Sequence, residues 1–514
     1  MRYDAAVPAA SRRFSSRLGL LVSMLGIAVG TGNVWRFPRI AAQNAGPDGA
    51  GGFLVAWILG LATWSLPLLV AEYAVGRRGR AGPVASFARM GGPRFAPAGA
   101  FVALVACGIM FYYAVVAGWC LYYAVRVAAA PLPATPAAAR AAWDGLHDGP
   151  WALVCHAAAV AAAYLAVRSG AASIERANRV LVPALLVAIG ACVLRAVTLD
   201  GAWDGIATLF APDLRPLARA RTWLDALTQN AWDTGAGWGL VLTYAAYMRR
   251  EDYVVRNAIA TGVGNNLVSL LSATMVFGTV FAVLGGTMPR AEILAVMKDS
   301  GPAATGLTFL WMPPLFAAMP AGRLFAVAFF GGLAFAALSS LIAMVEMAVA
   351  VLCDLGVGRG RARTAVGLGG YLLGLPSALS LDVLGNQDFV WGVGLLLSGM
   401  LVAAVVVRFS VARLFREVLD PIPGDLRWRG TLAFLLRAGI FAQGAILLGW
   451  WMDRAASDFA TGPWWDPTDP YGIATCLLQW AVAAVLAFAI GRVAVRRRAG
   501  YEAPETDEDP RPIP

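Results

Sequence analysis

Apolar stretches of about 20 residues, the length that spans a bilayer, recur along nearly the whole chain between short polar segments. An α-helix rises 1.5 Å per residue, so each stretch can cross a hydrocarbon core about 30 Å thick. We predict twelve membrane-spanning helices, at residues 18–41, 50–76, 97–128, 151–168, 174–200, 222–249, 253–287, 322–355, 361–380, 386–410, 430–452 and 471–497.

The composition supports this prediction. Of the 514 residues, 59% are hydrophobic and 14% are charged, whereas a soluble chain carries about 25% charged residues. The sequence is therefore typical of an all-α integral membrane protein with the lipid bilayer as its surroundings.

Positive charges are distributed unevenly among the loops. The net charge of +10 would suit a nucleic-acid partner, but the arginines gather in alternate loops and the loops between them are acidic. The arginine clusters lie at 12–17, 77–80, 168–179, 249–256, 359–363 and 496–498. This positive-inside pattern argues against nucleic-acid binding and predicts cytoplasmic N- and C-termini, hence an even number of spans. We expect a multi-pass protein of the plasma (inner) membrane.

The first span is interrupted by residues that break helices. Residues Gly26–Pro38 read G-I-A-V-G-T-G-N-V-W-R-F-P inside an apolar segment. In lipid, a broken helix is tolerated only where its freed backbone groups face protein, ions or a water-filled cavity. We therefore predict that this span unwinds and lines a binding site.

The sixth span has the same kind of interruption. Residues Gln229–Leu240 read Q-N-A-W-D-T-G-A-G-W-G-L, with T-G-A-G-W echoing T-G-N-V-W of the first span. Spans one and six open two successive groups of five helices. Because each group makes an odd number of crossings, the second group starts from the opposite side of the membrane. Matched interruptions of this kind predict an inverted-repeat transporter that binds its solute and ions between the two breaks.

Residues suited to catalysis are sparse. The chain has two histidines, and its six cysteines lie in or beside spans without a CxxC pair. We see neither a metal-binding cluster nor a nucleophile–base pair, and predict that the protein is not an enzyme.

Five sequence blocks carry a family likeness. They are R-L-G at 17–19, G-T-G-N-V-W-R-F-P at 30–38, F-Y-Y-A-V-V-A-G-W at 111–119, L-T-Y-A-A-Y at 242–247 and L-S-S-L-I-A-M-V-E at 338–346. Their order and spacing resemble the neurotransmitter:sodium symporter family, whose bacterial members include the leucine transporter.

The resemblance implies a twelve-helix fold with a 5+5 inverted repeat and unwound helices 1 and 6. It divides the chain into a cytoplasmic segment 1–16, a core 17–410 holding helices 1–5 and 6–10, and helices 11–12 at 411–498. The remaining residues, 499–514, are charged and proline-rich, which predicts a disordered cytoplasmic tail.

The resemblance also implies two sodium sites built from oxygen ligands, which suit a hard cation. One site would use the Ala28 carbonyl with Asn33, Asp233 and Asn265. The other would use the carbonyls of Gly26, Val29 and Ala336 and the hydroxyls of Ser339 and Ser340.

The substrate would lie between the broken helices. In the family, backbone N–H groups at the break bind the substrate carboxylate, here those of Thr31 and Gly32, assisted by the Tyr113 hydroxyl. The remaining pocket residues would be Ala28, Ile109, Trp232, Gly235, Trp238, Ser340 and Met344. Gly30 stands where monoamine transporters have an aspartate, which favours a substrate with its own carboxylate.

The tryptophans Trp232 and Trp238 stand where bacterial relatives commonly have phenylalanine. They would either narrow the pocket for a small substrate or stack on a cation or aromatic ring, while Gly235 opens space. The sequence leaves the choice between these effects open.

Two gates follow from the resemblance. Arg36 would pair with Asp388 to close the outer vestibule, and Asp354 would act at the inner gate. The usual arginine partner of that acid aligns with Ser11, so that either Arg12 or Arg13 would take its place.

The chain departs from the family at the chloride site. Chloride-independent bacterial members carry a carboxylate on span seven, but this chain has Ser269 there and retains Gln229 on span six. Asp233 instead replaces a hydroxyl residue of span six. We hypothesise that Asp233, with Gln229 and Ser269, substitutes for chloride, and that proton counter-transport when sodium leaves is a corollary.

Together these features predict a sodium-coupled symporter that moves an amino acid or similar small zwitterion into the cell by alternating access. The alternative is a non-transporting membrane sensor on the same scaffold. The identity of the substrate, the number of sodium ions per cycle and the oligomeric state are not encoded in any motif that we recognise.

Overall fold

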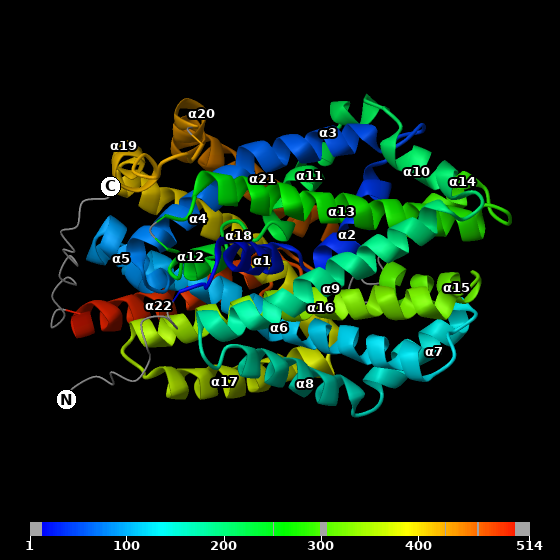
Figure 1. Cartoon of the computed structure of the whole chain (residues 1–514), viewed down its shortest axis with the longest axis horizontal. Helices are drawn as coiled ribbons and strands as arrows, with labels where there is room; N and C mark the ends of the chain where they lie inside the picture. The colour runs from blue at the N-terminus through cyan, green and yellow to red at the C-terminus, as the bar shows by residue number, and fades with distance from the viewer. Residues whose placement is uncertain (1–12, 250, 299–305, 427, 460–461, 499–514) are drawn as a thin grey trace.

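The computed structural model describes residues 13–498 except 250, 299–305, 427 and 460–461. Throughout this described part the regular structure is helical, without strands, and the long helices run side by side along the long axis (Figure 1). The expectations for Arg12, for most of segment 1–16 and for the tail 499–514 lie outside the described residues.

Each of the twelve predicted spans corresponds to a helix or a broken pair of helices. The first five are α1 (Arg17–Ala28) with α2 (Thr31–Asn44), α3 (Gly51–Gly60) with α4 (Leu66–Gly79), α6 (Ala96–Ala129), α8 (Trp151–Ala166) and α9 (Ala171–Val197). The next five are α11 (Ala220–Asp233) with α12 (Leu240–Ala245), α13 (Val255–Leu284), α16 (Gly322–Asp354), α17 (Arg359–Leu379) and α18 (Leu381–Phe409). The last two are α20 (Arg429–Phe434) with α21 (Ile440–Arg454), and α22 (Ile473–Arg498).

Shorter helices connect the spans. They are α5 (Pro83–Gly91), α7 (Pro136–His147), α10 (Ala202–Phe210), α14 (Arg290–Lys298), α15 (Met312–Ala317) and α19 (Val411–Leu414). Within the described residues, eight helical segments are by themselves long and apolar enough to cross a membrane, and two bent pairs raise the number to ten. The remaining two spans are the broken pair α11/α12 and the glycine-rich α17.

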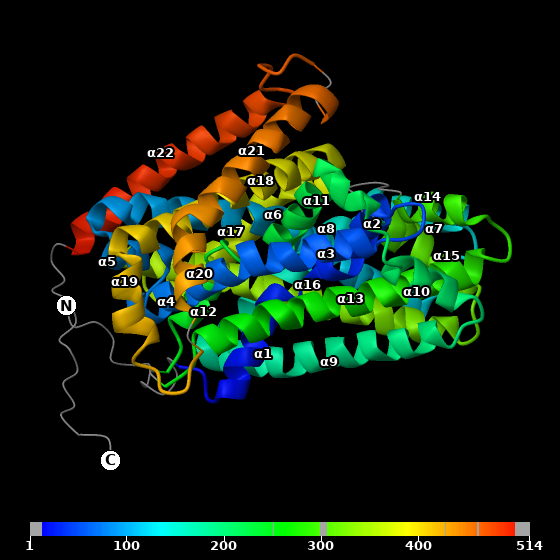
Figure 2. The same ribbon diagram turned by 90° about the horizontal axis from the view of Figure 1, so that it is seen from above.

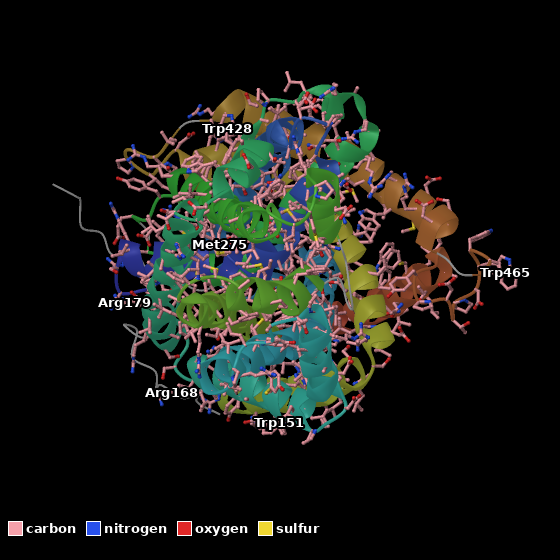
Figure 3. The ribbon with its side chains drawn as sticks, turned by 90° about the vertical axis from the view of Figure 1, so that its right-hand side faces the viewer. Trp151, Arg168, Arg179, Met275, Trp428 and Trp465 are labelled. Atoms are coloured by element: carbon pink, nitrogen blue, oxygen red, sulfur yellow. The ribbon has the colours of Figure 1, made fainter. Side chains whose placement is uncertain are left out.

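Burial separates central from peripheral spans. Within the most apolar window of each helix, 78% of α16 lies buried in the bundle, but only 28% of α9 and of α22. Figure 2 shows α21 and α22 at one edge of the bundle and α9 at the opposite edge. In Figure 3, Trp151 and Trp465 lie at the periphery, where their large apolar surfaces are exposed, while Met275 is buried inside. The outward apolar surface suits lipid.

The predicted interruptions of spans one and six are confirmed. The axes of α1 and α2 differ by 49°, and Val29 and Gly30 between them are extended. Between α11 and α12 the backbone takes positive φ angles, which glycine adopts at little cost. They are 67° at Gly235, 87° at Gly237 and 78° at Gly239.

The second span forms hydrogen bonds to the sixth span at three places along its length. Before the break of the sixth span, the Trp57 carbonyl accepts from Asn230 Nδ2 at 2.8 Å. At the level of the break, Thr234 Oγ1 donates to Ser65 Oγ at 2.9 Å. After the break, at the start of α12, the Glu72 carboxylate accepts from the backbone N–H groups of Gly239 at 2.8 Å and Leu242 at 3.2 Å.

A π-helical turn at Leu61–Ser65 joins α3 to α4 within the second span. Trp57 makes its contact before this turn and Glu72 makes its contact after it. Ser65 makes its contact from within the turn.

Candidate functional site

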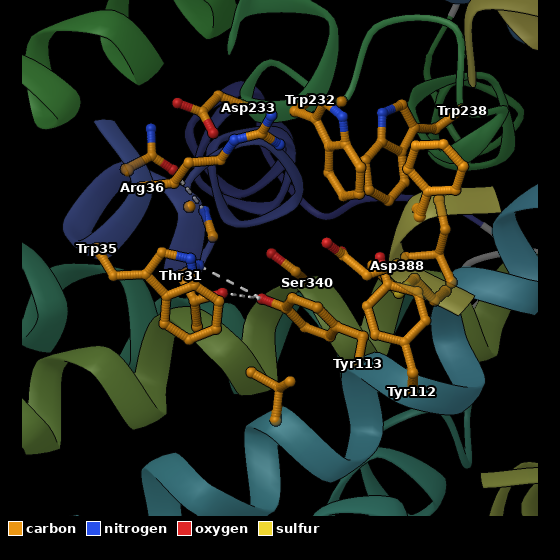
Figure 4. A pocket seen from close by; sticks show the side chains of 18 of the residues that line it. Thr31, Trp35, Arg36, Tyr112, Tyr113, Trp232, Asp233, Trp238, Ser340 and Asp388 are labelled. Atoms are coloured by element: carbon orange, nitrogen blue, oxygen red, sulfur yellow. Dashed lines mark hydrogen bonds between the residues drawn. The ribbon is translucent and has the colours of Figure 1, made fainter. Parts of the chain in front are cut away.

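A cavity of about 480 Å³ lies between the two breaks. All ten residues predicted to bind substrate line this cavity, as do the predicted gate residues Arg36 and Asp388 (Figure 4). Phe389, Trp451 and Tyr471 also line the cavity.

One wall of the cavity offers hydrogen-bonding groups at the start of α2. The backbone N–H and the hydroxyl of Thr31 each donate to the Tyr113 hydroxyl at 3.4 Å (Figure 4). A Cβ on Gly30 would lie 3.2 Å from Ser340 Oγ and 3.3 Å from Tyr113 Oη, so the glycine leaves this backbone approachable. Exposed N–H groups at a helix start attract an anionic group, so this wall can hold a carboxylate.

Oxygen atoms from three spans converge beside this wall. One end of the Asn265 amide lies 2.9 Å from the Ala28 carbonyl oxygen and 3.1 Å from the Asp233 carbonyl oxygen. If the Asn265 side chain places its amide nitrogen at this end, the nitrogen donates to both carbonyls. If it places its amide oxygen there instead, that oxygen faces the two carbonyl oxygens, an arrangement that a cation stabilises. Asn33 Nδ2 is 2.8 Å from the same end of Asn265. The structure thus brings together all four residues predicted for the first sodium site.

Four of the five residues predicted for the second sodium site lie together across α1 and α16. Ser340 Oγ is 3.4 Å from the Gly26 carbonyl oxygen, and a Cβ on Gly26 would lie 3.3 Å from Ser339 Cβ. Ser339 Oγ donates to the Ala336 carbonyl of its own helix at 2.9 Å. Val29 is fully buried where α1 ends, and its backbone N–H bonds to Leu25.

Asp233 lies in the corner predicted for chloride replacement. Gln229 Nε2 donates to its Oδ2, and Ser269 is a further hydrogen-bonding neighbour of this carboxylate. A Cβ on Gly32 would lie 2.6 Å from Asp233 Oδ1, so only glycine fits opposite the carboxylate without a shift. The side chain of Asp233 is therefore fixed beside the first group of converging oxygens.

The outer gate residues face one cavity without forming an ion pair. The Arg36 guanidinium carbon lies 4.7 Å from the centroid of the Trp232 ring (Figure 4), a cation–π arrangement. Among the ion pairs of the described residues, none joins Arg36 to Asp388. Their pairing stays a prediction for a closed state.

The opposite end of the bundle is closed by an ion pair of Glu346 whose partner, Arg359, was not predicted from the sequence. Arg359 pairs with Glu346 at 2.6 Å, and the Tyr247 hydroxyl donates to the same carboxylate at 2.5 Å. Phe14 is buried against Tyr244 and Tyr247, with ring centroids 5.9 and 6.2 Å away. The glutamate inside an apolar span was the available signal, since such acids usually have a partner.

The predicted inner-gate acid caps a short helix. Asp354 accepts from the backbone N–H groups of Gly82 at 3.2 Å and Ala85 at 3.0 Å, at the start of α5. Carboxylates are favourable at this position because they satisfy free N–H groups. The partnership of Asp354 with Arg12 or Arg13 stays untested.

Comparisons with known proteins agree with this architecture. The family model described as the sodium:neurotransmitter symporter family matches residues 11–144 and 148–413. An uncharacterised sodium-dependent transporter of Methanocaldococcus jannaschii is 31% identical over 353 residues, covering 66% of this chain and 69% of the relative. An uncharacterised sodium-dependent transporter of Bacillus subtilis is 29% identical over 454 residues, covering 83% and 94%.

A solved structure shows the same fold. The crystal structure of MhsT in complex with L-phenylalanine superposes with a TM-score of 0.73 at 28% identity, covering 85% of this chain and 98% of that chain. The twelve-span fold predicted from the sequence is confirmed, and the relatives support sodium-coupled transport across a membrane. The chain belongs to the sodium:neurotransmitter symporter family.

Proposed function

We propose that this protein is a symporter that uses sodium to move an amino acid or similar small zwitterion into the cell by alternating access. The observation that carries the proposal is the cavity between the breaks, where the Thr31 N–H and Tyr113 hydroxyl lie near the converging oxygens of Ala28 and Asn265. A zwitterion's carboxylate would meet the former groups and a sodium ion the latter. The bound L-phenylalanine of MhsT supports an amino-acid substrate.

Two sodium ions would bind per substrate. The first would lie among Ala28, Asn33, Asp233 and Asn265, and the second between α1 and α16. Binding at both positions stabilises one arrangement of the broken helices relative to the bundle, which couples the ions to the substrate.

Transport would not require chloride. The carboxylate of Asp233, held by Gln229, supplies a fixed negative charge where chloride-dependent members bind the anion. A buried carboxylate is costly without a compensating charge, and a sodium ion supplies one. When sodium leaves, protonation of Asp233 would compensate instead, which gives proton counter-transport.

The protein would lie in the plasma (inner) membrane with both termini in the cytoplasm. In that orientation Phe389, Trp451 and Tyr471 of the cavity lining would lie towards the outer side, and the ion pair of Glu346 and Arg359 would lie towards the cytoplasm. Such an arrangement would suit a transporter that receives its substrate from outside. A sensor on the same scaffold would bind the same ligands without moving them.

A screen and an uptake assay test the proposal. Purified protein is heated with each amino acid and a set of small osmolytes, with sodium or with N-methylglucamine, because a ligand of the native state raises its apparent stability. The best ligand is then offered to proteoliposomes with an inward sodium gradient, in chloride or gluconate. We expect sodium-dependent uptake that is equal in both anions. Binding without uptake would favour the sensor, and a requirement for chloride would refute the role of Asp233.

A further inference from the structure

Buried polar groups without partners lie beneath the second sodium site. The residues Ser23, Asn178 and Tyr244 are fully buried. The Ser23 hydroxyl, both polar atoms of the Asn178 amide and the Tyr244 hydroxyl have no partner at full hydrogen-bonding geometry among the described residues, although Tyr244 and Asn178 lie close enough to interact with each other. Each such group costs about 1–3 kcal/mol when it is left unsatisfied, so a polar or cationic ligand that contacts them would be stabilised here.

These groups lie next to one another. A Cβ on Gly26 would lie 3.3 Å from Asn178 Oδ1 and 3.3 Å from Ser339 Cβ, so the amide borders the α1–α16 contact. The Tyr244 hydroxyl is a neighbour of the Asn178 side chain. Ser23 lies one helical turn before Gly26 on α1, and residues at this spacing share a helix face.

The cluster continues towards the closed end of the bundle. Tyr244 lies near the Glu346 carboxylate, which Arg359 and the Tyr247 hydroxyl hold. Glu346 follows Ser339 by seven residues on α16, or two helical turns, so both lie on the same side of that helix. Polar groups therefore extend from the second sodium site to the end where Arg359 is 31% exposed.

We propose that Ser23, Asn178 and Tyr244 form a transient binding station for a partly hydrated sodium ion on its way from the second sodium site to the cytoplasm. The inference rests on the proposed function and adds a site to it. Two hydroxyls and an amide oxygen are hard, neutral ligands that suit sodium. Neutral ligands hold the ion weakly, and a pathway needs sites that bind well enough to be entered but weakly enough to be left.

The variants that test the station are Asn178→Leu, which keeps much of the side-chain volume without polar atoms, and Ser23→Ala. Asn178→Ser restores one oxygen and serves as the rescue variant. The matched control is Thr222→Val, since Thr222 is equally buried and also has an unpartnered hydroxyl, but lies in the first turn of α11.

Four measurements use radioactive ²²Na⁺ or the substrate found in the screen. Equilibrium ²²Na⁺ binding to purified protein should stay within about twofold of the parent for every variant. In Asn178→Leu and Ser23→Ala, ²²Na⁺ dissociation and net sodium-driven uptake should slow at least about fivefold, while substrate exchange at equal sodium on both sides stays within about twofold. A fivefold change in rate corresponds to about 1 kcal/mol.

The outcomes separate the possibilities. Unchanged dissociation and uptake in both variants, or slowing equal to that of Thr222→Val, would overturn the station and leave a structural water site. Loss of equilibrium ²²Na⁺ binding would also overturn it, because the residues would then belong to the stable sodium site. If Asn178→Leu does not give a monodisperse protein, Ser23→Ala and Asn178→Ser decide. Absence of uptake by the parent protein refutes the proposed function, whereas ²²Na⁺ dissociation from purified protein still tests the station.

Discussion

Replacing Asp233 by asparagine removes one negative charge while keeping the shape of the side chain. In the parent protein its carboxylate accepts from Gln229, and its own backbone carbonyl lies 3.1 Å from the Asn265 amide. The charge is therefore fixed within a few ångströms of the oxygens that would bind the first sodium ion. Asp233→Asn should weaken sodium binding at this site without unfolding it.

The size of the effect follows from the surroundings of Asp233. Two unit charges about 4 Å apart attract by about 4 kcal/mol at an effective dielectric constant of about 20. The nearby Arg36 already offsets part of the carboxylate's charge, and asparagine retains an oxygen dipole. We therefore expect a loss of about 2–4 kcal/mol, which raises the sodium Kd about 30- to 700-fold.

The assay is sodium titration of substrate uptake and of thermal stability, in chloride and in gluconate. Chloride should restore sodium affinity in Asp233→Asn because a mobile anion replaces the missing charge. Asp388→Asn is the matched control, since Asp388 is a carboxylate of the same cavity outside the predicted sodium sites. It should impair transport equally in both anions. Normal uptake by Asp233→Asn in chloride and gluconate alike would refute the charge-substitution argument.

Three further predictions concern the framework around the site. Glu72→Ala leaves two N–H groups of the broken sixth span unsatisfied and should cost about 2–6 kcal/mol, read as a lower melting temperature with Glu72→Gln in between. Gly237→Ala places a Cβ 2.8 Å from Gly399 Cα at a φ of 87°, so it should destabilise by at least about 1–2 kcal/mol; an unchanged melting temperature would contradict the strain. A hydrogen bond from Arg215 holds the pKa of the loop residue Asp213 at about 2. Because this pKa is depressed, the stabilisation is complete above about pH 4 and is lost as pH falls towards 2. Asp213→Asn should therefore flatten the fall in melting temperature between those pH values.

The sequence was sufficient to place the spans and both breaks. Glycines that are clustered with polar residues inside an apolar run favour a break in the helix, and the structure shows the break of the sixth span at Gly235, Gly237 and Gly239. The cavity between the breaks then follows from the repeat, because matched interruptions must meet where their freed backbone groups can be satisfied.

Contacts that depend on rotamer or conformational state were not predictable in the same way. The position of Arg36 over Trp232 is one of several open to a long side chain, and its pairing with Asp388 requires a different state of the protein. The partnership of Glu346 with Arg359 crosses the end of α16, where small changes in loop geometry decide which arginine reaches inward. Asn178 resembles an ordinary polar residue in sequence, and only its complete burial reveals that it needs a partner.

The π turn at Leu61–Ser65 sets the rotation of α4 relative to α3 about the axis of the second span. Because of this rotation, residues on both sides of the turn face the broken sixth span. One extra residue in such a turn rotates everything beyond it by about 100° relative to a plain α-helix. Removing any single residue there would keep an apolar helix of nearly the same length, yet would swing Glu72 away from the N–H groups that it caps. The span is therefore tolerant of apolar exchange but intolerant of a one-residue deletion, and insertions or deletions among functional relatives should avoid this turn.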